Sequence, residues 1–269
     1  MDSARGSGGS AVRALYNRFL PVHDQRDRLK VVLVSPRNPL NIGAAARAMA
    51  NFGFSHLAVV TPYAPHWREA RSAVGAPEVL KNAVSLECLA DATSDCTLVV
   101  GTGTLTYRKP EQRVVRLPEL APLIRQELDS GGRVGLLFGP EKHGLTCDDL
   151  SYCHALVEIP TDARQPSMNL GQAVAVCLYE LAVRSFDFAA PGLSRPRAGE
   201  REPAAASKNL DILAGLVEQV MEAAHYSPAT MRNANRHDMR LLLRRLAPNE
   251  KDAQRMLGLF RRILWRLKR

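Results

Sequence analysis

The residues that could do chemistry fall in three short motifs, Asn41-x-Gly43-x-x-x-Arg47, Phe138-Gly139-x-Glu141 and Ser167-x-Asn169. In the second motif the apolar run Val134–Phe138 stops at Gly139-Pro140, and a glycine turn lets backbone N–H and C=O groups approach a ligand closely. In the first motif Arg47 interrupts a run of small residues against which a neighbour can pack tightly. The pattern predicts a ligand site at the Gly139 turn and leaves Arg47 in need of an explanation.

Three other kinds of site fit the sequence poorly. The turn 101–103 follows a strand, but Thr106 takes the third glycine position of a dinucleotide fingerprint. No GxxxxGK[ST] phosphate loop occurs in the chain. Ser167 lacks the GxSxG setting of an acyl-enzyme nucleophile.

Cysteine and histidine usage favours reduced thiols and no metal. The five cysteines are an odd number without a CxxC pair, which suits a cytoplasmic protein better than a disulfide framework. The leader 1–10 lacks the apolar centre of a signal peptide, and no apolar run reaches the roughly 20 residues that span a bilayer. The candidate metal ligands match no standard zinc spacing; they are His143, Cys147, Cys153 and His154.

The elements that must position the motifs alternate between strands and helices. Apolar runs at 30–34, 56–60, 98–100, 134–138 and 155–159 predict strands, and 77–82 and 86–93 predict short helices between them. Asn41 is the expected N-cap of a helix that ends near Gly53, and a longer helix follows Ser167. This order predicts an α/β fold, with a mostly parallel sheet covered on both faces and ligand loops at the carboxyl ends of its strands.

Charge divides the chain into a nearly neutral part and a basic tail. The net charge is +9, and residues 207–269 hold 13 Lys and Arg against 6 Asp and Glu, an excess of +7. Three apolar stripes predict helices in that tail, with Asn249 as a further N-cap. We therefore expect a basic leader at 1–29, an α/β domain at 30–186, a linker at 187–208 and a helical, basic extension at 209–269 that suits a polyanionic partner.

Over about residues 30–186 the three motifs resemble those of the SPOUT superfamily, in particular the SpoU or TrmH type of RNA ribose 2′-O-methyltransferase. That family has the same motifs in the same order, and only Met168 departs from it, where leucine is usual. Methionine has about the same side-chain volume as leucine, so this difference does not weaken the resemblance. The resemblance implies a trefoil knot in the C-terminal part of the sheet, a homodimer, and S-adenosylmethionine as cofactor without a metal.

By the same resemblance the cofactor would lie in the knot and be held mostly by backbone groups. A purine edge and an amino-acid zwitterion can be bound in this way by exposed N–H and C=O groups at strand ends. The residues carried over from the family as cofactor-binding are Thr102, Gly103, Thr104, Gly139, Ile159, Pro166, Ser167 and Met168.

The resemblance also implies roles for the motif residues. Arg47 would clamp the target phosphate and stabilise the developing alkoxide; because a guanidinium is almost never deprotonated, the phosphate or a water would take the proton. Asn41, Glu141, Ser167 and Asn169 would orient Arg47 and the ribose. Simpler roles stay open, namely helix capping for Asn41 and Ser167 and a surface ion pair for Arg47.

The tail resembles that of the TrmJ-like subgroup, which methylates nucleotide 32 in the tRNA anticodon loop. This resemblance rests on LLLRRL at 241–246 and on the closing helix, where Arg255, Arg262, Arg266 and Arg269 share one face. The resemblance implies that the tail binds RNA; the alternative is that the tail forms a dimer contact. The expected activity is therefore tRNA 2′-O-methylation, and the alternatives are an rRNA ribose methyltransferase or a non-catalytic RNA-binding or assembly factor.

Overall fold

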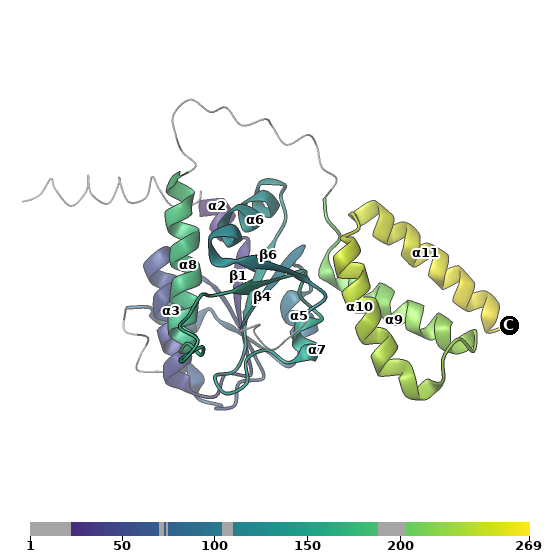
Figure 1. Ribbon diagram of the computed structural model, residues 1–269, viewed down its shortest axis with the longest axis horizontal. Coiled ribbons are helices and arrows are strands. Elements are labelled where there is room, and N and C mark those ends of the chain that lie inside the picture. Colours follow the sequence, from purple (N-terminus) through teal and green to yellow (C-terminus); the bar gives the residue numbers. More distant parts are fainter. Residues whose placement is uncertain (1–22, 70–72, 74, 104–109, 188–202) are drawn as a thin grey trace, which may run out of the picture.

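The computed structural model describes residues 23–69, 73, 75–103, 110–187 and 203–269 (Figure 1). Its centre is a seven-stranded sheet in the order β3-β2-β1-β6-β4-β7-β5, and every strand pairing within it is parallel. The strands are β1 (Leu29–Val34), β2 (His56–Val60), β3 (Val84–Leu86), β4 (Leu98–Thr102), β5 (Arg113–Arg116), β6 (Val134–Phe138) and β7 (Ala155–Glu158). The predicted α/β class with a mostly parallel sheet is confirmed.

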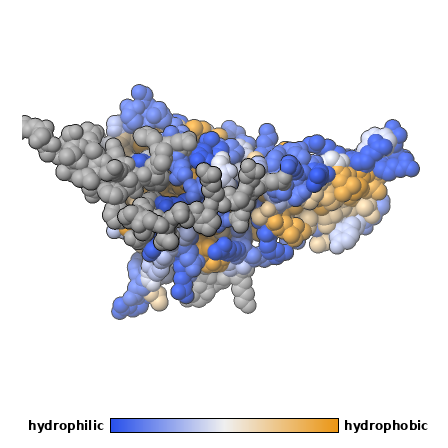
Figure 2. All heavy atoms as spheres, turned by 90° about the horizontal axis from the view of Figure 1, so that it is seen from above, coloured by the Kyte–Doolittle hydropathy of each residue, from blue (hydrophilic) through white to orange (hydrophobic). Residues whose placement is uncertain are grey.

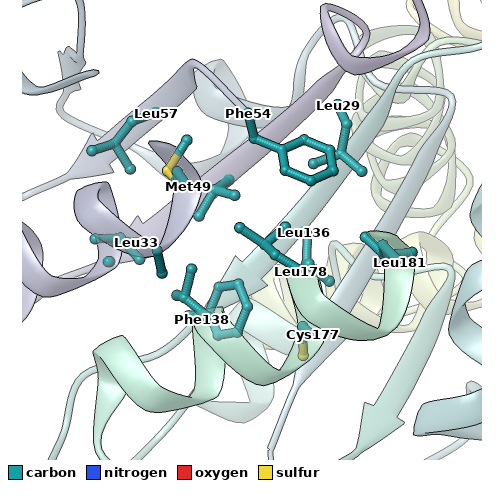
Figure 3. Close-up of a cluster of buried hydrophobic side chains, with 14 of the residues drawn as sticks. Leu29, Leu33, Met49, Phe54, Leu57, Leu136, Phe138, Cys177, Leu178 and Leu181 are labelled. Carbon is teal, nitrogen blue, oxygen red and sulfur yellow. The ribbon is translucent and has the colours of Figure 1, made fainter. Parts of the chain in front are cut away.

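Helices cover both faces of this sheet. Successive side chains of a strand point to opposite faces, and both sets are apolar in the central strands, so each face needs a layer of helices to bury it. Leu33 and Phe138 belong to a core beneath α3 (Pro39–Phe52), α4 (Pro77–Lys81), α6 (Leu117–Asp129) and α8 (Leu170–Asp187). Val32 and Leu137, their neighbours in sequence, belong to the core beneath α5 (Leu89–Thr93) and α7 (Cys147–Leu150). Figure 3 shows the first core, in which side chains of β1, β2 and β6 meet those of α3 and α8.

The small residues of α3 let it pack closely against α8. A Cβ atom built on Gly171 of α8 would lie 2.6 Å from the Cβ atom of Ala44, so the two backbones approach as neither could with larger side chains. Gly53 ends α3 in the left-handed conformation, with φ +77°, as predicted. The partner for which these small residues leave room is therefore α8.

The prediction that Asn41 caps α3 is wrong. The N-cap is Asn38, whose side chain accepts a hydrogen bond from the N–H of Leu40 at 2.9 Å, and Pro39 opens the helix. Proline suits the first helical position because its missing N–H would have no intrahelical partner there. Asn41 lies inside the helix, where its side chain is available for other contacts.

Two strands and one helix boundary also differ from the prediction. β3 and β5 were not expected, and Leu86, predicted to begin a helix, lies in β3 and pairs with Val60. Both strands expose most of their residues at the sheet margins, so they lack the apolar runs that mark the central strands. The predicted trefoil knot stays a prediction, since residues 104–109 lie outside the described part of the chain.

The C-terminal helices form a small bundle of their own, to the right in Figure 1. They are α9 (Ser207–Ala223), α10 (Arg232–Leu246) and α11 (Glu250–Leu267), and they share a core of Leu213, Ala214, Leu243 and Leu257. Asn249 caps α11 as predicted and accepts a hydrogen bond from the N–H of Asp252 at 2.8 Å. The residue limits predicted for the domains and the linker stay predictions.

The helical extension, defined here as residues 207–269, is fastened to the sheet domain by hydrogen bonds. The N–H and Oγ of Ser207 donate to the backbone oxygen of Cys96 at 2.9 and 2.8 Å, and the N–H of Lys208 donates to that of Ser94. On α10, Arg244 donates through Nε to the backbone oxygen of Tyr152 at 2.8 Å. Within the described residues, no helix is long and apolar enough to cross a membrane.

Candidate active site

A cavity of about 360 Å³ lies at the carboxyl ends of β4, β6 and β7. Parallel strands present their following loops on one edge of a sheet, which is the usual place for a ligand in such folds. The cavity is lined by seven of the eight residues predicted to bind the cofactor, Thr102, Gly103, Gly139, Ile159, Pro166, Ser167 and Met168. The eighth, Thr104, lies outside the described residues.

Gly139 is required at the bend because the chain folds back onto it. A Cβ atom at this position would lie 2.2 Å from the backbone nitrogen of Leu145 and 2.3 Å from the carbonyl carbon of Gly144. The N–H of Gly144 donates to the backbone oxygen of Pro140 at 2.9 Å, and Gly144 itself has φ +65°. Residues 139–145, here called the glycine bend, therefore form a tight wall of exposed backbone.

Hydrogen bonds also hold the other walls of the cavity. Thr102 Oγ1 donates to the backbone oxygen of Leu137 at 2.9 Å, which ties the end of β4 to β6. Thr161 Oγ1 donates to the backbone oxygen of Pro166 at 3.1 Å and closes the loop that precedes α8. The cavity thus has fixed polar edges, while Ile159, Met168 and Leu145 supply apolar surface.

Glu141 connects the glycine bend to the start of α3. Its carboxylate accepts hydrogen bonds from the backbone N–H groups of Arg37 and Asn38, at 3.0 and 3.1 Å, and from Asn41 Nδ2 at 2.8 Å. Burial raises the pKa of Glu141, but these hydrogen bonds outweigh burial and leave the pKa below its ordinary value. Glu141 is therefore an ionised acceptor at neutral pH, which makes it a poor proton acceptor for catalysis.

Asn41 and Asn169 extend this network to α8. Asn169 Nδ2 donates to Asn41 Oδ1 at 2.9 Å, and Asn169 Oδ1 accepts from the N–H of Gly171 at 2.9 Å. The helix that follows Ser167 is thus capped by Asn169, which leaves Ser167 exposed on the cavity wall. Four of the five predicted catalytic residues come together here, Asn41, Glu141, Ser167 and Asn169.

Arg47 lies apart from this group. It is exposed on α3, six residues beyond Asn41, or about 9 Å along the helix axis. It does not line the cavity, and the structure shows no carboxylate paired with it among the described residues. A surface ion pair therefore does not explain this cation within the described part of the chain.

Sequence reasoning missed two contributions to the site. The backbone N–H groups of Arg37 and Asn38 bind Glu141, a contact that no side-chain pattern could reveal. The cap Asn38 could have been found, because Asn-Pro is a common start of a helix. The described residues contain no group of three or more histidine, cysteine or acidic side chains arranged to hold a metal ion, and all five cysteines are free.

Comparison with known proteins gives consistent relatives. A protein named tRNA (cytidine/uridine/adenosine-2′-O-)-methyltransferase TrmJ from Pseudomonas aeruginosa is 40% identical over 156 residues, which cover 58% of this chain and 60% of that protein. A TrmJ from Cronobacter sakazakii is 30% identical over 86% of this chain and 94% of its own length. The chain thus spans less than two thirds of the length of the Pseudomonas relative.

A solved structure agrees with these sequences. The crystal structure of TrmJ from Z. mobilis ZM4 matches with a TM-score of 0.74 and 29% identity, and the match covers 87% of this chain and 98% of that one. The model of the SpoU rRNA Methylase family matches residues 28–179, a span that contains all three motifs. The chain therefore belongs to the SpoU rRNA methylase family.

Proposed function

We propose that this protein transfers the methyl group of S-adenosylmethionine to a ribose 2′-hydroxyl of tRNA, at a cytidine or uridine in position 32 of the anticodon loop. The observation that carries the proposal is the hydrogen-bonded set Glu141–Asn41–Asn169, which joins all three motifs beside the cavity. The TrmJ names of the relatives support tRNA as the substrate. The choice of position 32 rests on the resemblance of the basic tail.

The cavity suits a donor of this kind. Its volume of about 360 Å³ lies within the usual range for small-molecule sites, roughly 300–1,000 Å³. The backbone of Gly103 and of the glycine bend would hold polar edges of the donor, while Ile159 and Met168 would pack against its base. When bound, S-adenosylmethionine supplies an electrophilic methyl group on a sulfonium.

The residues of this chain have separate tasks in that reaction. Arg47 binds the phosphate next to the target ribose and stabilises the negative charge that grows on its 2′-oxygen. Asn41 and Asn169 orient the ribose, with Glu141 holding Asn41 in place, and Ser167 contributes its hydroxyl from the cavity wall. The phosphate or a water takes the proton, because Arg47 and Glu141 are both poor acceptors near neutral pH.

A homodimer would bring Arg47 to a cavity. Arg47 lies on α3, which runs from the sheet edge that carries the cavity toward the opposite edge. Arg47 is therefore farther than Asn41 from the cavity of its own chain. Exposed apolar side chains on α3 and α8 offer a contact surface for a second copy; they are Leu40, Tyr179 and Val183. In this arrangement one chain supplies the donor cavity and the other supplies Arg47.

The helical extension would hold a larger part of the RNA. The predicted basic residues are all exposed, namely Arg255, Arg262 and Arg266 on α11 and Arg269 just after its end. Figure 2 shows hydrophobic surface over the same extension, flanked by hydrophilic residues. Exposed arginines beside apolar surface suit phosphate contacts along a folded RNA.

A methyl-transfer assay with labelled donor tests the proposal on bulk tRNA and on bulk rRNA. We expect methylation of tRNA by the wild type, and a loss of at least about 100-fold in kcat with Arg47→Ala, in which a transition-state contact is removed. Methylation of rRNA alone would replace the proposed substrate, and RNA binding without methyl transfer by the wild type would favour an assembly factor. Mapping 2′-O-methyl marks in RNA from cells with and without the protein identifies the nucleotide.

Mixed dimers test whether two chains build one site. Arg47→Ala and Gly139→Ala chains are inactive alone, the first without the clamp and the second without a donor cavity. If the chains share the site, co-expression restores about a quarter of wild-type activity, because half of the dimers carry one intact site. If Arg47 serves its own cavity, no mixed dimer is active.

A further inference from the structure

An exposed arginine and an exposed tyrosine lie together on the strand edge that carries the cavity. The guanidinium carbon of Arg37 lies 5.5 Å from the centroid of the Tyr63 ring, and Tyr63 is 76% exposed. Among the described residues, no carboxylate pairs with Arg37. The pair therefore presents to solvent an exposed cation that lies over an exposed aromatic ring.

The loops that carry this pair are fastened to each other. Ser35 follows β1 and Thr61 follows the adjacent β2, and their hydroxyl oxygens lie 2.8 Å apart. The N–H of Tyr63 donates to the backbone oxygen of Pro36 at 3.2 Å. The pair thus rests on a double loop held by hydrogen bonds.

Both loops begin with a residue in an unfavourable backbone conformation. Ser35 has φ +45° and Thr61 has φ +42°, values that residues other than glycine rarely adopt. Such conformations persist where the surrounding structure enforces them, and they cluster at functional sites. Two such residues in neighbouring loops indicate that the surrounding structure holds both loops in one conformation.

The pair is also linked to the donor cavity. The carboxylate of Glu141, a residue that lines the cavity, accepts the backbone N–H of Arg37 at 3.0 Å. β1 is the direct neighbour of β6, and β2 follows, so the pair lies about 5 to 10 Å across the sheet from the strand that enters the glycine bend. A nucleotide next to the target ribose would reach it.

We propose that Arg37 and Tyr63 form a stacking platform for an unpaired base next to the methylated nucleotide, with Arg37 also contacting its phosphate. Single-stranded RNA is commonly bound by bases that stack on aromatic rings and arginine planes. A protein partner is the less suitable occupant, because the platform shares the edge where the RNA must enter. The inference rests on the proposed function and adds a contact that the three motifs do not include.

Steady-state kinetics with tRNA tests the platform. Tyr63→Ala and Arg37→Ala each raise KM for tRNA about 10-fold and change kcat by less than about twofold, while Tyr63→Phe, which keeps the ring, behaves like the wild type. Lys81→Ala is the matched control, since it removes an exposed cation that pairs with Glu78 on α4. Thermal unfolding and donor affinity of all variants stay at wild-type values.

Binding of a fluorescently labelled anticodon stem-loop RNA, measured by fluorescence anisotropy, separates the platform from the reaction. A weaker affinity in Tyr63→Ala but not in Tyr63→Phe supports the platform even if the wild type transfers no methyl group, an outcome that would refute only the proposed function. If Tyr63→Ala and Lys81→Ala bind RNA alike while the wild type methylates tRNA, the platform is wrong and the activity stands.

Discussion

Arg240 and Arg244 of α10 and the arginines of α11 have opposite environments, although both helices belong to the same basic extension. Arg244 of α10 is 2% exposed, and it binds Asp211 Oδ1 and the backbone oxygen of Tyr152, both at 2.8 Å. Arg240 binds Asp148 Oδ1 at 2.5 Å and lies over the Tyr152 ring. Arg262 of α11 and Arg269, two residues beyond its end, are exposed and lie over the ring of Trp265.

This difference shows that net charge does not measure the capacity to bind RNA. Arg240 and Arg244 of α10 bind residues of the sheet domain, whereas the arginines of α11 are exposed to solvent. The hydrogen-bonded network beside the cavity differs from both groups of arginines, because it consists of the Glu141 carboxylate, the side-chain amides of Asn41 and Asn169, and backbone N–H groups. The buried arginines should therefore govern stability, the exposed ones RNA affinity, and the strand edge the reaction.

The largest expected effect is that of Arg244→Met. The substitution leaves the carboxylate of Asp211 without its buried partner, and breaking such a pair costs about 3–5 kcal/mol. We expect the free energy of unfolding, measured in urea, to fall by this amount. Arg255→Met on α11 is the matched control and should change it by less than about 0.5 kcal/mol. Equal losses in both variants would remove the distinction between the two helices.

The second prediction concerns the glycine bend. Gly139→Ala places a Cβ atom against the backbone of Gly144 and Leu145, so the bend must open. We expect a loss of about 1–3 kcal/mol in stability and a loss of S-adenosylmethionine binding in calorimetry. Gly131→Ala is a control for glycine replacement at a distance, since nothing lies within 4 Å of its added Cβ atom, although its φ of +86° costs some strain. Retained donor binding in Gly139→Ala would show that the bend does not hold the donor.

The third prediction sharpens the comparison on the side of α11. The double variant Arg262→Gln, Arg266→Gln should keep wild-type stability but weaken tRNA binding. If each arginine neutralises one phosphate, the slope of log affinity against log salt should become shallower by about 1.4–1.8 in total. Filter binding at several salt concentrations gives that slope, and an unchanged slope would assign this face to a protein contact instead.

The smallest expected effect is the pH dependence of the Glu141 network. The pKa of Glu141 is below its ordinary 4.5 in the folded protein, so this group stabilises the fold at pH values above 4.5. The contribution is lost as the pH falls from 4.5 through the lowered pKa. Glu141→Gln should lack this component when urea unfolding is compared at pH 6 and below pH 4, and an identical pH profile would contradict it.

Much of the fold could be predicted because the central strands are buried on both faces. The run Val134–Phe138 is buried throughout, and His56–Val60 is apolar after its first residue; both coincide with strands. β3 and β5 escaped prediction because Val84 and Val114 are 53% and 44% exposed at the sheet margins. Within the site, the motifs indicated residues that the structure brings together beside the cavity, but Asn41 was assigned to the cap because asparagine is a favoured N-cap residue and the Asn38-Pro39 start was overlooked.

The environments of the arginines could not be predicted. On α10 the charged Arg244 is buried, whereas the apolar Leu246 two positions later is 62% exposed. The reason is a partner far away in the sequence, since Tyr152 precedes Arg244 by 92 positions. Likewise, the position of Arg47 outside its own cavity depends on how α3 packs, which no local pattern encodes.

The short helix α7 stands between two parts of the molecule. Its residue Asp148 accepts the hydrogen bond of Arg240, and its first residue, Cys147, comes two positions after the end of the glycine bend at Leu145. RNA bound to the extension would thus act on the wall of the cavity through α7 and Thr146, the residue that joins α7 to the glycine bend. Deleting the extension would accordingly disturb occupancy of that cavity as well as the grip on RNA, so point substitutions are the cleaner tool.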